Sequence, residues 1–82
     1  MGITYEDHIA RFSDIATVEE AEGLLEWLER HPQAEVDLAH CVHMHTANLQ
    51  VLMAVRPKIA VWPEDTDFSL WLKQPLAPPE HR

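Results

Sequence analysis

The clearest hydrophobic pattern in the chain lies between residues 17 and 31. Its apolar positions recur three and four residues apart, at Val18, Ala21, Leu24, Leu25 and Leu28. This spacing predicts a helix with one buried face. Thr17 and Glu20 form a capping box at its start, in which a hydroxyl and a carboxylate bind free backbone N–H groups, and Pro32 ends it.

Three other segments have the composition of strands. β-branched and aromatic residues in the segment 3–12 indicate one or two short strands. A short interior strand is predicted over residues 34–40, and another over residues 58–62.

Two further helices are predicted over residues 46–57 and 65–75. Their apolar stripes are Leu49, Leu52 and Met53 in the first helix, and Phe68, Trp71 and Leu72 in the second. Pro57 ends the first of them, and Thr46 is placed to cap its start through its hydroxyl.

The order strand, helix, strand, helix, strand, helix predicts the α/β class. Strands that alternate with helices favour a small βαβαβα domain with a mostly parallel sheet, with its helices packed largely on one face. We expect one domain over residues 1–74, followed by a flexible, Pro-rich C-terminal tail over residues 75–82.

Composition narrows the function classes. The chain has 82 residues, of which 46% are hydrophobic, enough for a single compact core. Lys and Arg number 6 against 14 for Asp and Glu, and the formal charge of −8 opposes binding to nucleic acid or to an anionic membrane. No apolar run is long enough to span a bilayer, and the single cysteine fits a reducing cytoplasm.

The stretch "CVHMHTANLQVL", residues 41–52, holds the strongest candidate chemistry. Cys41, His43 and His45 share one parity, so an extended segment would place all three on one side. Thiolate and imidazole are good ligands for zinc or copper, which makes these three a candidate metal site. The chain has no second cluster of Cys and His residues to complete a four-ligand structural site.

The segment "VDLAHCVHMHTANLQVLMA" resembles the central signature of STAS domains, the anti-sigma-factor antagonist family. That signature is an apolar strand ending in Asp-Leu, a short apolar link, and then Asp-Ser-Ser-Gly-Leu at the start of a helix. Val36, Asp37 and Leu38 match the strand, Cys41 and Met44 fall on the link, and His45, Thr46, Ala47 and Asn48 stand where Asp-Ser-Ser-Gly would be. The resemblance covers roughly residues 8–73 and implies a minimal member that lacks the family's last strand and helix.

The resemblance implies a regulatory module that binds a protein partner and has no catalytic activity. In the family the second serine accepts a phosphate, but here Ala47 occupies that position and has no hydroxyl, so the usual phospho-switch is absent. Thr46 stands at the first serine, where a helix-capping role is favoured over phosphorylation. The implied partner-binding residues are His43, His45, Thr46, Asn48 and Gln50.

The missing elements also imply an exposed sheet edge near Trp62 and Trp71, where a homodimer or another partner would bind. No complete catalytic set and no glycine-rich phosphate loop is visible in the sequence. Two hypotheses therefore stay open: a STAS-like interaction module without a cofactor, and a small zinc or copper protein that uses Cys41, His43 and His45.

Overall fold

The computed structural model of the chain describes residues 2–76. Four strands form one sheet: β1 (Ile3–Glu6), β2 (Ile9–Ala16), β3 (Glu35–Met44) and β4 (Lys58–Val61). The helical elements are the short 3₁₀ helix η1 (Val18–Glu20) and the α-helices α1 (Ala21–Arg30), α2 (Thr46–Val55) and α3 (Thr66–Leu76). In this part of the chain no helix has the length and apolar character needed to cross a membrane.

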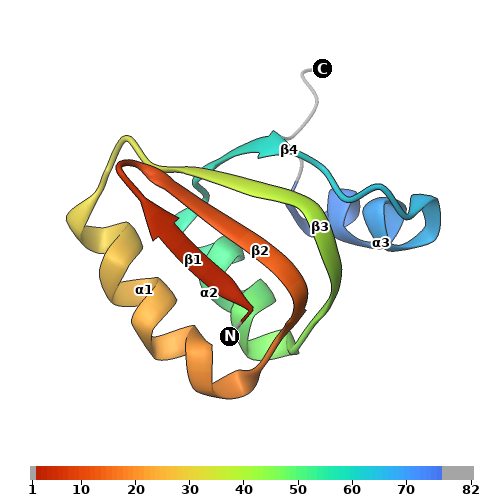
Figure 1. The fold of residues 1–82 in the computed structure, drawn as a ribbon, viewed down its shortest axis with the longest axis horizontal. Helices are drawn as coiled ribbons and strands as arrows, with labels where there is room; N and C mark the ends of the chain where they lie inside the picture. Colours follow the sequence, from red (N-terminus) through yellow and green to blue (C-terminus); the bar gives the residue numbers. More distant parts are fainter. Residues whose placement is uncertain (1, 77–82) are drawn as a thin grey trace.

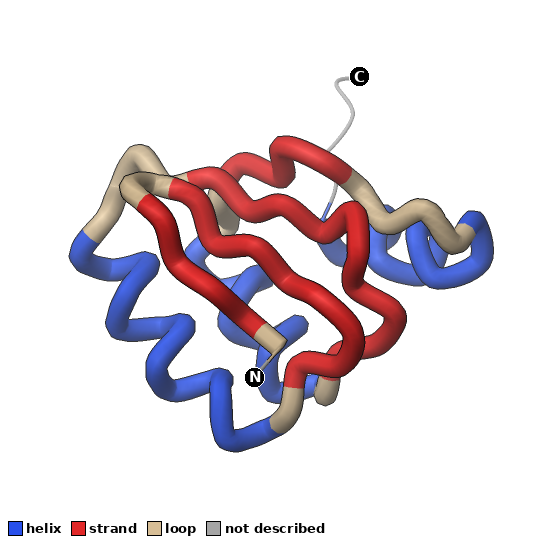
Figure 2. Tube along the Cα trace, in the orientation of Figure 1, coloured by secondary structure: helices blue, strands red, loops and turns tan. Residues whose placement is uncertain are grey.

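The sheet has the order β1-β2-β3-β4 and is mostly parallel. β1 and β2 form an antiparallel hairpin, whereas β3 runs parallel to both β2 and β4. α1 connects β2 to β3, α2 connects β3 to β4, and both helices lie behind the same face of the sheet (Figures 1 and 2). α3 lies to one side, beyond the bent end of β3 (Figure 1). The prediction of an α/β domain with a mostly parallel sheet is confirmed.

One side of the sheet and the helices behind it form a single core. Its fully buried large side chains are Ile3, Phe12, Leu24, Leu28, Val36, Leu38, Met44, Leu52 and Leu72, together with the polar Asn48. The opposite side of the sheet is polar and carries cross-strand ion pairs. Arg11 pairs there with Glu6 and with Asp37, and Lys58 lies 3.9 Å from Glu35.

β3 contains two more residues than the part of β2 that it pairs with. Arg11 and Ser13 lie opposite Asp37 and His40, and Asp14 and Ile15 lie opposite Cys41 and His43, so each step adds one residue to β3. Such bulges bend a strand and shift which of its side chains face inward. The buried positions of β3 are accordingly Val36, Leu38, Cys41 and Met44, while Val42 and His43 both face outward. The bend is visible in Figure 1.

The structure corrects several details of the predicted elements. The helical spacing places Val18 in the buried face of the first helix, but Val18 lies in η1 and is exposed. Met53 is likewise exposed, because α2 turns Asn48 rather than Met53 toward the core. β3 extends to Met44 instead of ending near residue 40.

The end of the domain also differs from its predicted position. α3 continues through Pro75 to the buried Leu76, so the ordered domain extends past residue 74. The remainder of the predicted flexible tail, residues 77–82, lies outside the described residues.

Glu20 links the start of β1 to the start of the helical segment. Its Oε1 atom accepts hydrogen bonds from the backbone N–H groups of Gly2 and Ile3, at 2.9 and 3.0 Å, and its Oε2 atom accepts one from Thr17 at 3.1 Å. The predicted capping box of Thr17 and Glu20 is therefore present, and its carboxylate also anchors β1.

The two glycines should respond to substitution in opposite directions. A Cβ atom at Gly2 would lie 2.2 Å from the Ile15 carbonyl oxygen, so Gly2→Ala should lower the free energy of unfolding by about 1–3 kcal/mol. A Cβ at Gly23 meets nothing within 4 Å, so Gly23→Ala in α1 should raise it by about 0.5–1 kcal/mol. Urea denaturation of both variants measures the difference, and equal effects would contradict the close packing at Gly2.

Candidate functional site

The turn between β3 and α2 consists of one residue, His45. Its Nδ1 atom accepts a hydrogen bond from the backbone N–H of Ala47 at 3.0 Å, and this contact caps α2. Thr46 is the first residue of the helix, so the capping role that the sequence assigns to Thr46 belongs to His45. The His45 and Thr46 side chains are both exposed.

Asn48 is fully buried beneath this turn. Its Nδ2 atom donates hydrogen bonds to the carbonyl oxygens of Ala16 and Thr17, at 3.3 and 2.8 Å. The backbone N–H of His45 donates to Ala16 as well, at 2.8 Å. A partner cannot reach the Asn48 side chain in this arrangement, so the sequence-based expectation that Asn48 contacts a partner does not fit its position. Asn48 instead ties α2 to the end of β2.

The three candidate metal ligands do not share a face. Cys41 is buried in the core, and its thiol donates to the His43 carbonyl oxygen at 3.5 Å. Burial raises the pKa of this thiol to about 11, and the hydrogen bond to His43 lowers it by less. The rings of His43 and His45 lie outside the core, and His45 Nδ1 is already engaged in the cap.

A thiol must lose its proton to bind zinc, and burial opposes that loss at Cys41. Within residues 2–76, no three His, Cys, Asp or Glu side chains are grouped so that they could hold a metal ion. The zinc or copper site stays a prediction from the sequence, and the geometry of the described residues adds no support to it.

The exposed His43 ring begins a row of aromatic side chains that the sequence did not predict. His43 lies 6.5 Å from Phe68 of α3, measured between ring centroids, and Phe68 stacks on Trp71 at 6.0 Å. The Phe68 backbone N–H donates to Asp65 Oδ1 at 2.8 Å, which fixes the first turn of α3. We call His43, Phe68 and Trp71 the aromatic row. The apolar spacing of α3 hinted at Phe68 and Trp71, but their proximity to β3 has no local sequence signal.

A hollow of about 390 Å³ lies between the bent part of β3 and the segment before α3. Its lining residues are Asp14, Ala39, His40, Cys41, Val42, Glu64 and Asp65. The exposed side chains at its rim include three carboxylates, and none of the lining residues is Lys or Arg. The hollow is therefore acidic, and Val42 is one of the residues that line it.

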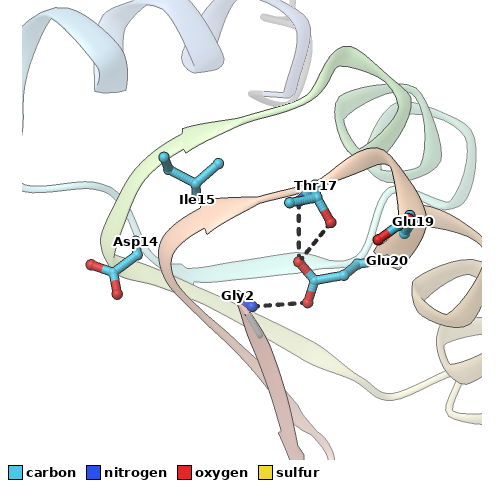
Figure 3. A pocket seen from close by; sticks show the side chains of 6 residues that line it. All are labelled: Gly2, Asp14, Ile15, Thr17, Glu19 and Glu20. Atoms are coloured by element: carbon cyan, nitrogen blue, oxygen red, sulfur yellow. Dashed lines mark hydrogen bonds between the residues drawn. The ribbon is translucent and has the colours of Figure 1, made fainter.

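Two other hollows lie elsewhere on the described residues, and one of them contains the candidate residues Ala47 and Gln50. Ala47 and Gln50 line a shallow apolar groove between α1 and α2, away from the aromatic row, together with Ala21, Glu22, Leu25, Val51 and Ala54. The second hollow lies beside Glu20 (Figure 3). Its Glu20 carboxylate points to Gly2 and Thr17, while Asp14 and Ile15 point away from it, so the carboxylate serves to hold the backbone (Figure 3).

No protein-family model, curated protein or solved structure matches the chain. The site is therefore interpreted from its own geometry. Of the five predicted partner-binding residues, His43, His45 and Thr46 lie exposed around the end of β3, Gln50 lies on the α1–α2 groove, and Asn48 is buried.

Substitution of Asn48 should reveal its structural role. Asn48→Ala removes one buried and one partly buried hydrogen bond to backbone carbonyl oxygens and should lower the free energy of unfolding by about 2–3 kcal/mol. Gln50→Ala, on the exposed side of the same helix, should change it by less than about 0.5 kcal/mol. Urea denaturation followed by circular dichroism measures both values, and equal stabilities for the two variants would contradict the role of Asn48.

The Cys41 thiol should react slowly in the folded protein. With its pKa at about 11, roughly one thiol in a thousand is ionised at pH 8, against about one in ten for a cysteine with the ordinary pKa of 9.0. A disulfide reagent should therefore label native protein at least about a hundredfold more slowly than protein in urea. The native rate should rise about tenfold per pH unit up to pH 10. A native rate equal to the rate in urea would contradict the burial.

The same shift predicts how stability depends on pH. The unfolded chain loses the Cys41 proton near its ordinary pKa of 9.0, whereas the folded chain keeps it up to about 11. The unfolded state then binds fewer protons than the folded state, so the contribution of Cys41 to stability falls as the pH rises through this interval. Cys41→Ala should lack this contribution when unfolding curves are compared across the same pH range.

Proposed function

We propose that the protein is a non-enzymatic interaction module that binds a protein partner through the end of β3 and the adjoining face of α3. The observation that carries this proposal is the aromatic row, in which His43 and Trp71 are exposed and the half-buried Phe68 lies between them. Aromatic residues, above all Trp and Tyr, dominate the binding energy of protein interfaces because they offer large contact areas and lose few rotamers on binding. His45 and Thr46 would extend the surface across the start of α2.

The way the row is held supports a binding role. Phe68 belongs to a helix whose first turn is fixed by Asp65, and His43 belongs to a strand paired with β2. Side chains on such rigid elements lose little conformational freedom when a partner binds, which favours affinity. Cys41, the cysteine next to this surface, is buried and has a raised pKa, so its environment favours packing over nucleophilic catalysis.

We further propose that this module is STAS-like. Each element that the resemblance expects within residues 8–73 has a counterpart here, from β2 and α1 through β3 and α2 to β4 and α3. The position of the family's acceptor serine falls at Ala47, in the first turn of α2. A module of this kind would bind its partner without control by phosphorylation at that position.

Co-purification from extract of the native host tests the binding surface. Trp71→Ala and His43→Ala should each lose most of the protein recovered by the wild-type bait, because both remove part of the aromatic row. Val18→Ala is the matched control, since Val18 is an exposed apolar residue in η1. Each variant is first checked for wild-type stability in urea. Unchanged recovery with Trp71→Ala would refute the proposed surface.

A further inference from the structure

Exposed apolar side chains lie on α3 and on the bulge of β3. Val42 is 65% exposed, Leu70 60% and Trp71 48%. Together with His43 and Phe68, which link β3 to α3, we call these residues the α3 patch. Single exposed apolar residues are ordinary, but a group of this size on two rigid elements is typical of an interaction site.

The hollow beside Val42 is lined by three carboxylates and by no Lys or Arg, and Lys73 is the one Lys or Arg residue in α3. Asp14, Glu64 and Asp65 line the hollow that Val42 also lines, and Asp67 lies in the first turn of α3 beside Phe68. No Lys or Arg is among the residues that line the hollow. The surface therefore combines aromatic rings with a negative rim.

The cations of the described residues are engaged or located elsewhere. Arg11 and Lys58 form ion pairs on the polar side of the sheet, and Lys73 lies over the Trp62 ring at 5.6 Å. Arg30 is in the last turn of α1, and Arg56 follows the last turn of α2. None of these side chains lines the hollow.

From this arrangement we infer that the partner of the α3 patch is a basic protein segment that carries at least one large apolar side chain. The apolar side chain would pack on Trp71 and Phe68, and Arg or Lys side chains would meet the carboxylates of Asp14, Glu64 and Asp65. Complementary charge favours the right partner and speeds its association, and a guanidinium can also stack on an aromatic ring. This inference rests on the proposed function and specifies the chemistry of the partner.

Charge also decides against a second copy of this chain as the occupant. Two copies that met through their α3 patches would bring the same carboxylates together, and each copy has a formal charge of −8. Like charges across an interface cost binding energy. A basic partner removes that cost and turns the negative rim into a source of specificity.

Two synthetic peptides test the inference. The first is an amphipathic peptide of Leu, Trp and Arg, and the second has Gln in place of every Arg. The basic peptide should bind the wild-type protein at least about tenfold more tightly than the Gln peptide does, and the affinity of the basic peptide should fall as salt is added. Fluorescence anisotropy of labelled peptide measures both affinities. Equal binding of the two peptides would overturn the inference.

Charge variants locate the binding site on the molecule. The double variant Asp14→Asn with Glu64→Gln should weaken binding of the basic peptide by about threefold to tenfold. Glu26→Gln with Glu29→Gln changes two exposed residues of α1 to the same net charge, so it should bind like the wild type. If both double variants lose the same affinity, the peptide responds to net charge alone and the inference is wrong.

Trp71→Ala separates the inference from the proposed function. It should weaken binding of the basic peptide at least about tenfold, because it removes the largest apolar contact of the patch. If Trp71→Ala abolishes recovery of the host partner while the Arg-to-Gln peptide binds as well as the basic one, the surface stands and its proposed basic partner falls. If Trp71→Ala changes neither the recovery of the host partner nor the affinity for the basic peptide, the proposed function itself is wrong.

Discussion

The packing of β3 against the core determines which side chains near the end of this strand are buried and which are exposed. Val36, Leu38, Cys41 and Met44 all have to be buried, although a regular strand cannot turn side chains at these four positions to one side. Two extra residues relative to β2 solve this conflict, because each one reverses the side on which the following residues lie. Cys41 and Met44 consequently enter the core while Val42 and His43 face outward. Without this bend, His43 would not meet Phe68 of α3.

The same end of the sheet is secured by polar contacts to backbone. Asn48 donates to the carbonyl oxygens of Ala16 and Thr17, and the His45 N–H donates to that of Ala16. Glu20 accepts hydrogen bonds from the N–H groups of Gly2, Ile3 and Thr17. These bonds satisfy the free backbone groups where β2 ends and α2 begins, which would otherwise be costly to bury. The turn that follows His43 is thus held in place by hydrogen bonds to the end of β2.

Local features of the fold could be predicted from the sequence, and long-range ones could not. The capping box of Thr17 and Glu20, the helices and the alternation of strands with helices depend on neighbouring residues, whose patterns are visible in the chain. The register of β3 depends on β2, which is distant in sequence, so the assumption of regular alternation grouped Cys41 with His43 and His45. The burial of Asn48 could not be predicted, because its hydrogen-bond partners, the Ala16 and Thr17 carbonyl groups, are distant in sequence. Thr46 is a preferred cap by residue type, but the backbone places His45 at that position.

Charge is distributed differently on the polar side of the sheet and beside α3. On the polar side of the sheet, Arg11 and Lys58 face carboxylates on neighbouring strands, so charge is balanced within the fold. Beside α3, the carboxylates of Glu64 and Asp65 border exposed apolar side chains, with no Lys or Arg among the residues lining the hollow. An apolar surface alone would bind many partners, and a negative rim alone would bind weakly in salt. The proposed basic partner would use both features, and like charges would oppose a second copy of this acidic chain.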